Sequence, residues 1–422
     1  MPALIILVGI AHALLYAIVI PPWGLLDEHQ HFHYVQLIAE EQRTPVMWRD
    51  RVSSEIVDSV YAVRRYVTLG AAEMPDRAEL ERSDLFFDLY SYEGLHPPLT
   101  YMVLAPFYAL GSPDVLDKLF ILRIVGALLS GITLVLVWKS TRWLWPGAPA
   151  VAILATAYVA LLPERAASAG RVNNDLLVEI TCAGVFAVLA RSWARGPTWR
   201  QAALVGLCLG LGILSKLSVS ILLPVVLGGW IASALICRQR HSTTFGQTAL
   251  ILMLAVACLV PVVVRNLLLY GEPTGVNAFI ARIGPLVSGP LSERIVTGAV
   301  DLVRNSWVIV WDGARVVTKP SAAFMQLGLA ALSAGVVYAI GKAWRGHDAR
   351  FTPAVRSALI TAGAALVLVS ASTLMGYVQG SVPWVQGRFL LPALLPSAWL
   401  LGFGLWLVGR RWRGFVASLM AS

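Results

Sequence analysis

Residues 21–34 read PPWGLLDEHQHFHY and directly follow an apolar run over residues 3–20. The run is long enough to cross a bilayer as one helix, and it lacks the basic leader and cleavage site of a signal peptide. We therefore expect a retained membrane span. The stretch after it places two adjacent carboxylates and three histidines where the chain leaves the membrane. Its position predicts a site at the membrane surface, and later polar segments on the same side are candidates to complete it.

The composition is that of an integral membrane protein. The 422 residues are 57% hydrophobic and only 14% charged, which is far from the balance of a soluble domain. The net charge of +9 is explained by cytoplasmic loops and lipid headgroups and does not indicate nucleic acid. The four cysteines lie in or beside apolar runs without metal-type spacing, so we expect no disulfide.

The sequence predicts an all-α, polytopic fold with about ten transmembrane helices. Basic clusters such as Lys139/Arg142 and Arg410/Arg411 follow alternate spans, and the positive-inside rule then places them all in the cytoplasm if both termini are cytoplasmic. The predicted spans cover residues 3–20, 118–138, 148–163, 174–193, 200–214, 217–236, 246–264, 321–342, 354–376 and 389–409.

The number of spans depends on two apolar segments. Residues 97–110 are apolar but would reach only about 21 Å as a helix, too short for a hydrocarbon core of about 30 Å, so we expect a short juxtamembrane or re-entrant helix. Residues 201–236 would form a helix of roughly 54 Å with Lys216 near its middle. Because a charge at mid-bilayer costs about 2.5–3.5 kcal/mol, we expect two spans that turn at Lys216.

With this topology, the polar segments gather on the external side of a single transmembrane domain. They are the long loop 21–96, the loop that ends near Asp175, the turn at Lys216, the segment 265–320 and the segment before Arg388. The cytoplasmic loops are short and basic. We therefore expect the functional site at the external face.

Asp27 and Glu28 are the candidate catalytic residues. A helix that starts here would carry Asp27 and His31 on one face, because they are four residues apart. A carboxylate beside apolar surface suits a general base, a metal ligand, or both. The alternative is an ordinary acidic helix start. His29 and His33 have no HExxH pattern around them, which disfavours a transition-metal site.

Other polar residues are candidates for substrate binding, each with a structural alternative. Glu93 and His96 end the first loop beside a proline pair that also fixes the chain direction. Asn174 and Asp175 either cap a helix or bind a hydroxylated ligand. Single cations at span ends either bind membrane lipid headgroups or bind an anionic, phosphate-bearing lipid ligand. This last group comprises Lys216, Arg265 with Asn266, and Arg388 with Gln386.

These motifs, taken in order, resemble the GT-C superfamily of multi-pass glycosyltransferases that use polyprenyl-phosphate-linked sugars. Within it the chain looks most like the bacterial protein-mannosyltransferase-like membrane families. The resemblance extends from residue 21 to 396 and rests on PPWGLLDEHQHFHY, EGLHPPLTYMVLAPFY, GRVNNDLL, GLGILSKLS, RNLLLYGEPTG and QGRFLLPALLP.

The resemblance implies an acidic residue of the first external loop at the catalytic centre, which corresponds here to Asp27, with Glu28 beside it. In such enzymes the carboxylate deprotonates the acceptor hydroxyl, which displaces the lipid phosphate with inversion, and cations such as Lys216, Arg265 and Arg388 hold the phosphate. The first loop has no D-x-D pattern. The use of a divalent cation, Mg²⁺ or Mn²⁺, therefore stays open, with Asp27, Glu28 and Asp175 as its ligands.

The sequence thus predicts an inverting glycosyltransferase of the bacterial cytoplasmic membrane. It would act on its external side with a polyprenyl-phosphate sugar and a glycan, lipid or protein acceptor. A lipid or glycolipid flippase or transporter is the alternative, and it would require charges deep within the spans. A non-catalytic scaffold is a third hypothesis, in which Asp27 would be replaceable.

Overall fold

The structure is a computed structural model that describes residues 1–24, 27–68, 70–80, 89–308, 334–345, 350–382 and 387–420. Within these ranges the regular structure is helical, and one isolated bridge pairs Arg51 with Tyr90. The expected all-α fold is confirmed.

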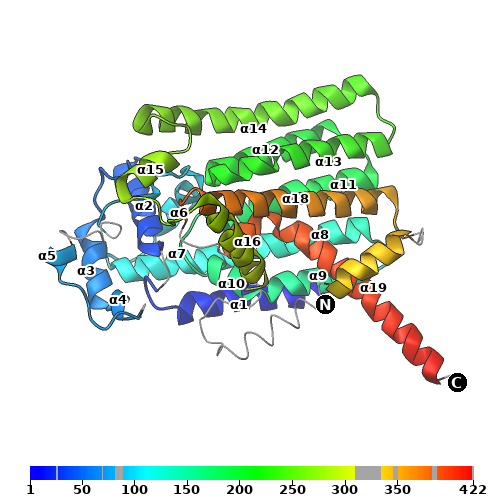
Figure 1. Ribbon diagram of the computed structural model, residues 1–422, viewed down its shortest axis with the longest axis horizontal. Coiled ribbons are helices and arrows are strands. Elements are labelled where there is room, and N and C mark those ends of the chain that lie inside the picture. The colour runs from blue at the N-terminus through cyan, green and yellow to red at the C-terminus, as the bar shows by residue number, and fades with distance from the viewer. Residues whose placement is uncertain are drawn as a thin grey trace.

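Long apolar helices form the body of the molecule (Figure 1). They are α1 (Pro2–Val19), α7 (Val115–Leu129), α8 (Gly131–Leu144), α9 (Pro149–Ala160), α11 (Asp175–Arg195), α12 (Trp199–Ser215), α13 (Leu223–Ile236), α14 (His241–Tyr270), α18 (Pro353–Val378) and α19 (Leu394–Met420). Residues 334–345 are also helical.

Shorter helices connect these elements or lie at their ends. They are α2 (Glu28–Glu41), α3 (Ser54–Ala62), α4 (Arg65–Thr68), α5 (Arg77–Leu80), α6 (Leu99–Tyr108), α10 (Pro163–Ala169), α15 (Val276–Ile283) and α16 (Leu291–Val308), with the 3₁₀ segments η2 (Glu93–Leu95), η3 (Leu217–Leu222) and η4 (Gly387–Ala393). The short apolar segment expected at residues 97–110 is the ten-residue helix α6.

In the part of the chain that the structure describes, seven helical segments are long and apolar enough to cross a membrane, or eight if the bent pair α9 and α10 is one broken span. The seven match predicted spans. Of the other predicted spans, 148–163 corresponds to the bent pair, 200–214 to the shorter apolar helix α12, and 321–342 lies largely outside the described residues. The count of ten is therefore not confirmed.

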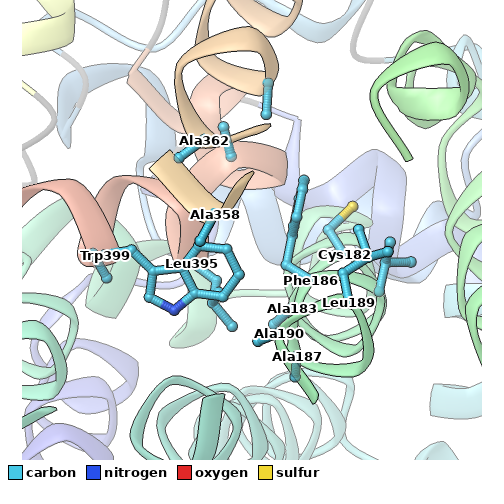
Figure 2. Close-up of a cluster of buried hydrophobic side chains, with 14 of the residues drawn as sticks. Cys182, Ala183, Phe186, Ala187, Leu189, Ala190, Ala358, Ala362, Leu395 and Trp399 are labelled. Atoms are coloured by element: carbon cyan, nitrogen blue, oxygen red, sulfur yellow. The ribbon is translucent and has the colours of Figure 1, made fainter. Parts of the chain in front are cut away.

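The membrane core is built around α11, which packs against α8, α12, α13 and α18. Figure 2 shows Trp399 of α19 and Ala358 of α18 facing Phe186 and the alanines of α11. The Phe186 and Trp399 rings meet edge to face at 6.3 Å, and both are fully buried. The small side chains let the helices approach closely, which is how membrane helices gain packing energy without a hydrophobic drive from water.

The helices of the first loop, α2 to α5, assemble with the short helix α6 at one end of the bundle, and α15 joins them there (Figure 1). Their own apolar cluster includes Trp23, Phe32, Ile56 and Tyr101. The chain ends marked N and C lie toward the opposite end (Figure 1). One end of the molecule therefore carries the long polar loop, and α14 runs along the outer edge of the bundle to reach it.

Candidate active site

Asp27 lies immediately before α2 and has a positive φ of 73°. A non-glycine residue in this region can cost about 1–3 kcal/mol, and such strained residues cluster at active sites and ligand-binding segments. The Tyr92 hydroxyl donates to Asp27 Oδ1, and Arg388 Nη2 donates to Oδ2 at 3.1 Å. Burial raises the pKa of Asp27, but the Arg388 charge and the Tyr92 hydrogen bond outweigh burial and lower it to about 2. The carboxylate is therefore ionised at neutral pH.

Glu28 has a different environment although it is the next residue. Its Oε1 accepts from Arg123 Nε at 2.8 Å and from the Val172 backbone N–H at 3.1 Å, and Arg123 Nη2 donates to Oε2. Both side chains of the ion pair are fully buried. Arg123 also donates to the carbonyls of Ala17 and Ile20 at the end of α1. Glu28 thus joins α1, α2 and α7 and does not line the cavity described below.

Asp175, Lys216 and Arg388 form a second charged group. Lys216 stands at the break between α12 and η3 with extended backbone, and its Nζ donates to Asp175 Oδ1 at 2.6 Å. Arg388 Nε lies 3.9 Å from Asp175 Oδ2. The Asp175 backbone N–H is bound by Asn173 Oδ1 at 2.8 Å. Asn173 therefore binds the helix start, and the Asp175 carboxylate is left to face the two cations.

Glu93 brings two histidines next to Asp27. Its Oε2 lies 3.1 Å from His96 Nε2 and 3.6 Å from His31 Nδ1, and His31 also contacts the Tyr101 hydroxyl at 2.8 Å. Burial, followed by the nearby Asp27 charge, raises the pKa of Glu93 well above its ordinary value. Burial lowers the pKa of His31 and takes that of His96 to about 3. Burial therefore favours the neutral form of these three side chains beside an ionised Asp27.

One cavity of about 610 Å³ connects these groups. Its polar side is lined by Asp27, His31, Glu93, His96, Asn174, Asp175, Lys216 and Arg388, so eight of the predicted site residues come together. A second side is apolar and comes from η3, α18 and η4, with Ile221, Val369 and Pro392 among its residues. A third comes from the first loop and from α15, with Tyr66, Tyr92 and Phe279.

Three predicted residues do not line this cavity. Glu28 is paired with Arg123, as described. Arg265 and Asn266 bind backbone carbonyls of the first loop, among them Gly94 O at 2.8 Å from Arg265 Nη1. Gln386 lies outside the described residues.

The three predicted metal ligands, Asp27, Glu28 and Asp175, all face arginine side chains. Both Glu28 oxygens are bound by Arg123, and the guanidinium of Arg388 faces both Asp27 and Asp175. Among the residues that the structure describes, no group of three or more histidine, cysteine or acidic side chains is arranged to hold a metal ion. An ion between Asp27 and Asp175 would have to displace the guanidinium.

Two important residues were not predicted from the sequence. Tyr92, which donates to Asp27, directly precedes Glu93 in the predicted motif, so its place beside that motif was an available signal. Arg123, the partner of Glu28, lies within a predicted span, where an arginine is costly unless it is paired.

The resemblance to the GT-C glycosyltransferases that the sequence predicts is confirmed by comparison with known proteins. Residues 95–264 match the family described as dolichyl-phosphate-mannose-protein mannosyltransferase. No curated protein matches the chain.

Solved structures share the fold at low sequence identity. ArnT from Cupriavidus metallidurans in the apo state has a TM-score of 0.55 at 15% identity, over 96% of this chain and 59% of that chain. The same protein bound to undecaprenyl phosphate has a TM-score of 0.53 at 16% identity, over 94% and 59%. The apo oligosaccharyltransferase of Archaeoglobus fulgidus has a TM-score of 0.51 at 12% identity, over 100% and 52%. The chain thus spans somewhat more than half the length of these proteins.

Proposed function

We propose that this protein transfers a sugar from a polyprenyl-phosphate donor to an acceptor hydroxyl, with inversion at the anomeric carbon. The observation that carries the proposal is the position of the ionised Asp27, which faces Arg388 in a cavity that also has an apolar side. Such a reaction needs three parts: a general base, cations that bind the phosphate, and an apolar surface for the lipid chain. The bound undecaprenyl phosphate of the similar ArnT structure supports the same donor class.

In the proposed reaction, Asp27 accepts the proton of the acceptor hydroxyl. The acceptor oxygen forms a bond to the anomeric carbon from one face, and the bond from that carbon to the phosphate oxygen breaks on the other. The electron pair leaves with the polyprenyl phosphate, whose charge Lys216 and Arg388 stabilise. Such cations act in a site with little water, where they stabilise developing charge more than they would in solution.

Binding of the donor would also make Asp27 a better base. In the free protein the Arg388 charge helps to hold the pKa of Asp27 near 2, which is low for a proton acceptor. A phosphate that shares Arg388 weakens its hold on the carboxylate. The pKa of Asp27 then rises, because burial opposes the ionised form. Donor binding and activation of the base are coupled through one guanidinium.

The apolar side of the cavity suits the polyprenyl chain. Its residues come from η3, α18 and η4, which belong to or adjoin candidate membrane spans, so the chain could leave the cavity toward lipid. The acceptor would reach Asp27 from the side of Tyr92 and the other external segments. Glycan, lipid and protein hydroxyls all meet the chemical requirement.

We place the reaction on the external side of the bacterial cytoplasmic membrane. The support is the predicted topology, in which the basic loops are cytoplasmic, together with the assembly of α2 to α6 at the end opposite the marked termini (Figure 1). We also propose that the reaction needs no divalent ion, because Arg388 already supplies positive charge between Asp27 and Asp175.

The test is transfer from a radiolabelled undecaprenyl-phosphate sugar by the purified protein in detergent, compared with Asp27→Asn. We expect product from the wild type and very little from the variant. Equal transfer by both proteins would refute the assignment of Asp27. If the wild type moves the labelled lipid between leaflets of vesicles and forms no glycoside, the protein is a transporter.

A further inference from the structure

Arg265 lies near the end of α14 and is bound to two separate stretches of the first loop. Its Nη1 donates to Gly94 O at 2.8 Å, and its Nη2 donates to Pro45 O at 2.8 Å. Weaker contacts to Asn266 Oδ1 at 3.2 Å and Thr44 Oγ1 at 3.4 Å complete the acceptors around these two nitrogens. The forked guanidinium thus holds two chain segments that are about fifty residues apart in sequence.

Two neighbours on the same helix end reinforce this contact. Tyr270 donates its hydroxyl to Gly94 O at 3.1 Å and accepts from the Met47 backbone N–H at 3.1 Å. Asn266 is fully buried, and its Nδ2 lies 3.5 Å from Leu95 O and 3.2 Å from Pro273 O. The end of α14 therefore binds the backbone of residues 45–47 and of residues 94–95.

The two loop segments also pack tightly against each other. A Cβ added at Gly94 would lie 2.7 Å from the Met47 nitrogen and 2.8 Å from the Pro45 oxygen, so only glycine permits the crossing. Glu93 and His96, which line the cavity, flank the residues that α14 holds. The position of these two side chains thus depends on the bonds that Arg265, Asn266 and Tyr270 make to the loop backbone.

The same contacts argue against a direct role for Arg265 in binding phosphate. Its side chain does not line the cavity, and both terminal nitrogens already have acceptors. Breaking these bonds to reach a ligand would remove the Arg265 donor from Pro45 O and leave Gly94 O with the Tyr270 hydroxyl as its donor.

We infer that Arg265, Asn266 and Tyr270 are positioning residues for the transfer reaction, an inference that rests on the proposed function. They act through the backbone of residues 45–47 and 94–95, which sets Glu93 and His96 next to Asp27. An error of about 1 Å in such a placement can lower a rate by about 100-fold. We therefore expect their loss to reduce kcat and to leave the affinity for the donor phosphate unchanged.

The test compares Arg265→Lys, Tyr270→Phe and the control Arg200→Ala, in which an exposed arginine at the start of α12 is removed. Lysine keeps the charge but cannot reach both carbonyls with one ammonium group. For Arg265→Lys we expect kcat to fall about 10- to 100-fold, while the Kd for undecaprenyl phosphate stays within about twofold. Tyr270→Phe should show a smaller loss in the same direction, and Arg200→Ala should match the wild type.

Hydrogen exchange provides a measurement that does not depend on activity. In the purified variants, amides in peptides covering residues 44–48 and 93–96 of the first loop should exchange faster than in the wild type. Amides of α14 itself should exchange at the wild-type rate. If Arg265→Lys keeps normal kcat and normal exchange, or if it mainly weakens undecaprenyl phosphate binding, the inference is wrong. If the wild type shows no transfer at all, the proposed function fails, and the exchange data still decide whether α14 holds the loop.

Discussion

Replacement of Glu28 by glutamine should destabilise the protein more than it affects the chemistry. The substitution keeps the size of the side chain but removes the charge that faces Arg123, and both side chains are fully buried. Removing one partner of a buried ion pair leaves the other charge uncompensated and costs about 3–5 kcal/mol. The amide oxygen can still accept from the Val172 N–H, so the lower end of that range is expected.

The cost converts to a measurable change in Tm. An unfolding entropy of about 2.1 cal/mol/K per residue gives roughly 0.9 kcal/mol/K for a chain of this length. A loss of about 3 kcal/mol then lowers Tm by roughly 3 °C. Asp27→Asn should change Tm by less, because the Asp27 side chain is 25% exposed and lies at the cavity.

The assay is thermal unfolding of the detergent-solubilised protein, run beside sugar transfer below the lowered Tm. Glu28→Gln should lower Tm and keep most of the wild-type kcat. Asp27→Asn should keep most of the wild-type Tm and lose most of its kcat. A double variant Glu28→Gln/Arg123→Gln should be more stable than the sum of the single effects predicts, because the two side chains interact directly. A Glu28→Gln protein with unchanged Tm and no transfer would show that Glu28 takes part in the reaction.

Four further outcomes are expected. Asp27→Asn should lower kcat by about 10²- to 10⁴-fold, as loss of a general base does, and near-normal turnover would exclude it as the base. Lys216→Gln should raise the Kd of undecaprenyl phosphate roughly 10- to 150-fold, the equivalent of one charged hydrogen bond; an unchanged Kd in equilibrium binding would remove Lys216 from the phosphate site. Because the pKa of Asp27 in the free protein is about 2, the acidic limb of the kcat/KM profile, which reports the free enzyme, should lie below about pH 4. Tyr92→Phe removes a hydrogen bond that lowers this pKa and should move the limb to higher pH; a limb that stays in place would contradict this assignment. EDTA should leave transfer within about twofold of the untreated enzyme, and loss of activity that Mg²⁺ or Mn²⁺ restores would show that a metal is used.

The sequence was sufficient for the fold class and for the grouping of most polar residues. Apolar run lengths and the distribution of basic loops placed Asp27, Asp175, Lys216 and Arg388 on one predicted face, and the structure has all four on one cavity. These signals work because the cost of burying charge in lipid restricts where charged residues can lie. They carry little information on whether a 17-residue apolar helix such as α12 is a full span.

The orientation of individual side chains could not be obtained in the same way. Asp27 and Glu28 are adjacent and chemically alike, and only the packing of α7, which brings Arg123 to Glu28, separates their environments. Arg265 ends a span just as a phosphate-binding cation would, but its N–H groups suit backbone carbonyls equally well. Such choices depend on contacts between segments far apart in the chain, and no local pattern specifies them.

The bond between Arg388 and Asp27 has a consequence for biosynthesis. The two residues are 361 positions apart, and at about 5–20 residues per second a ribosome needs roughly 20–70 s to pass from one to the other. Throughout that time Asp27 lacks the guanidinium that faces it in the finished protein. The acidic end of the cavity is therefore neutralised only after nearly all other spans have been inserted.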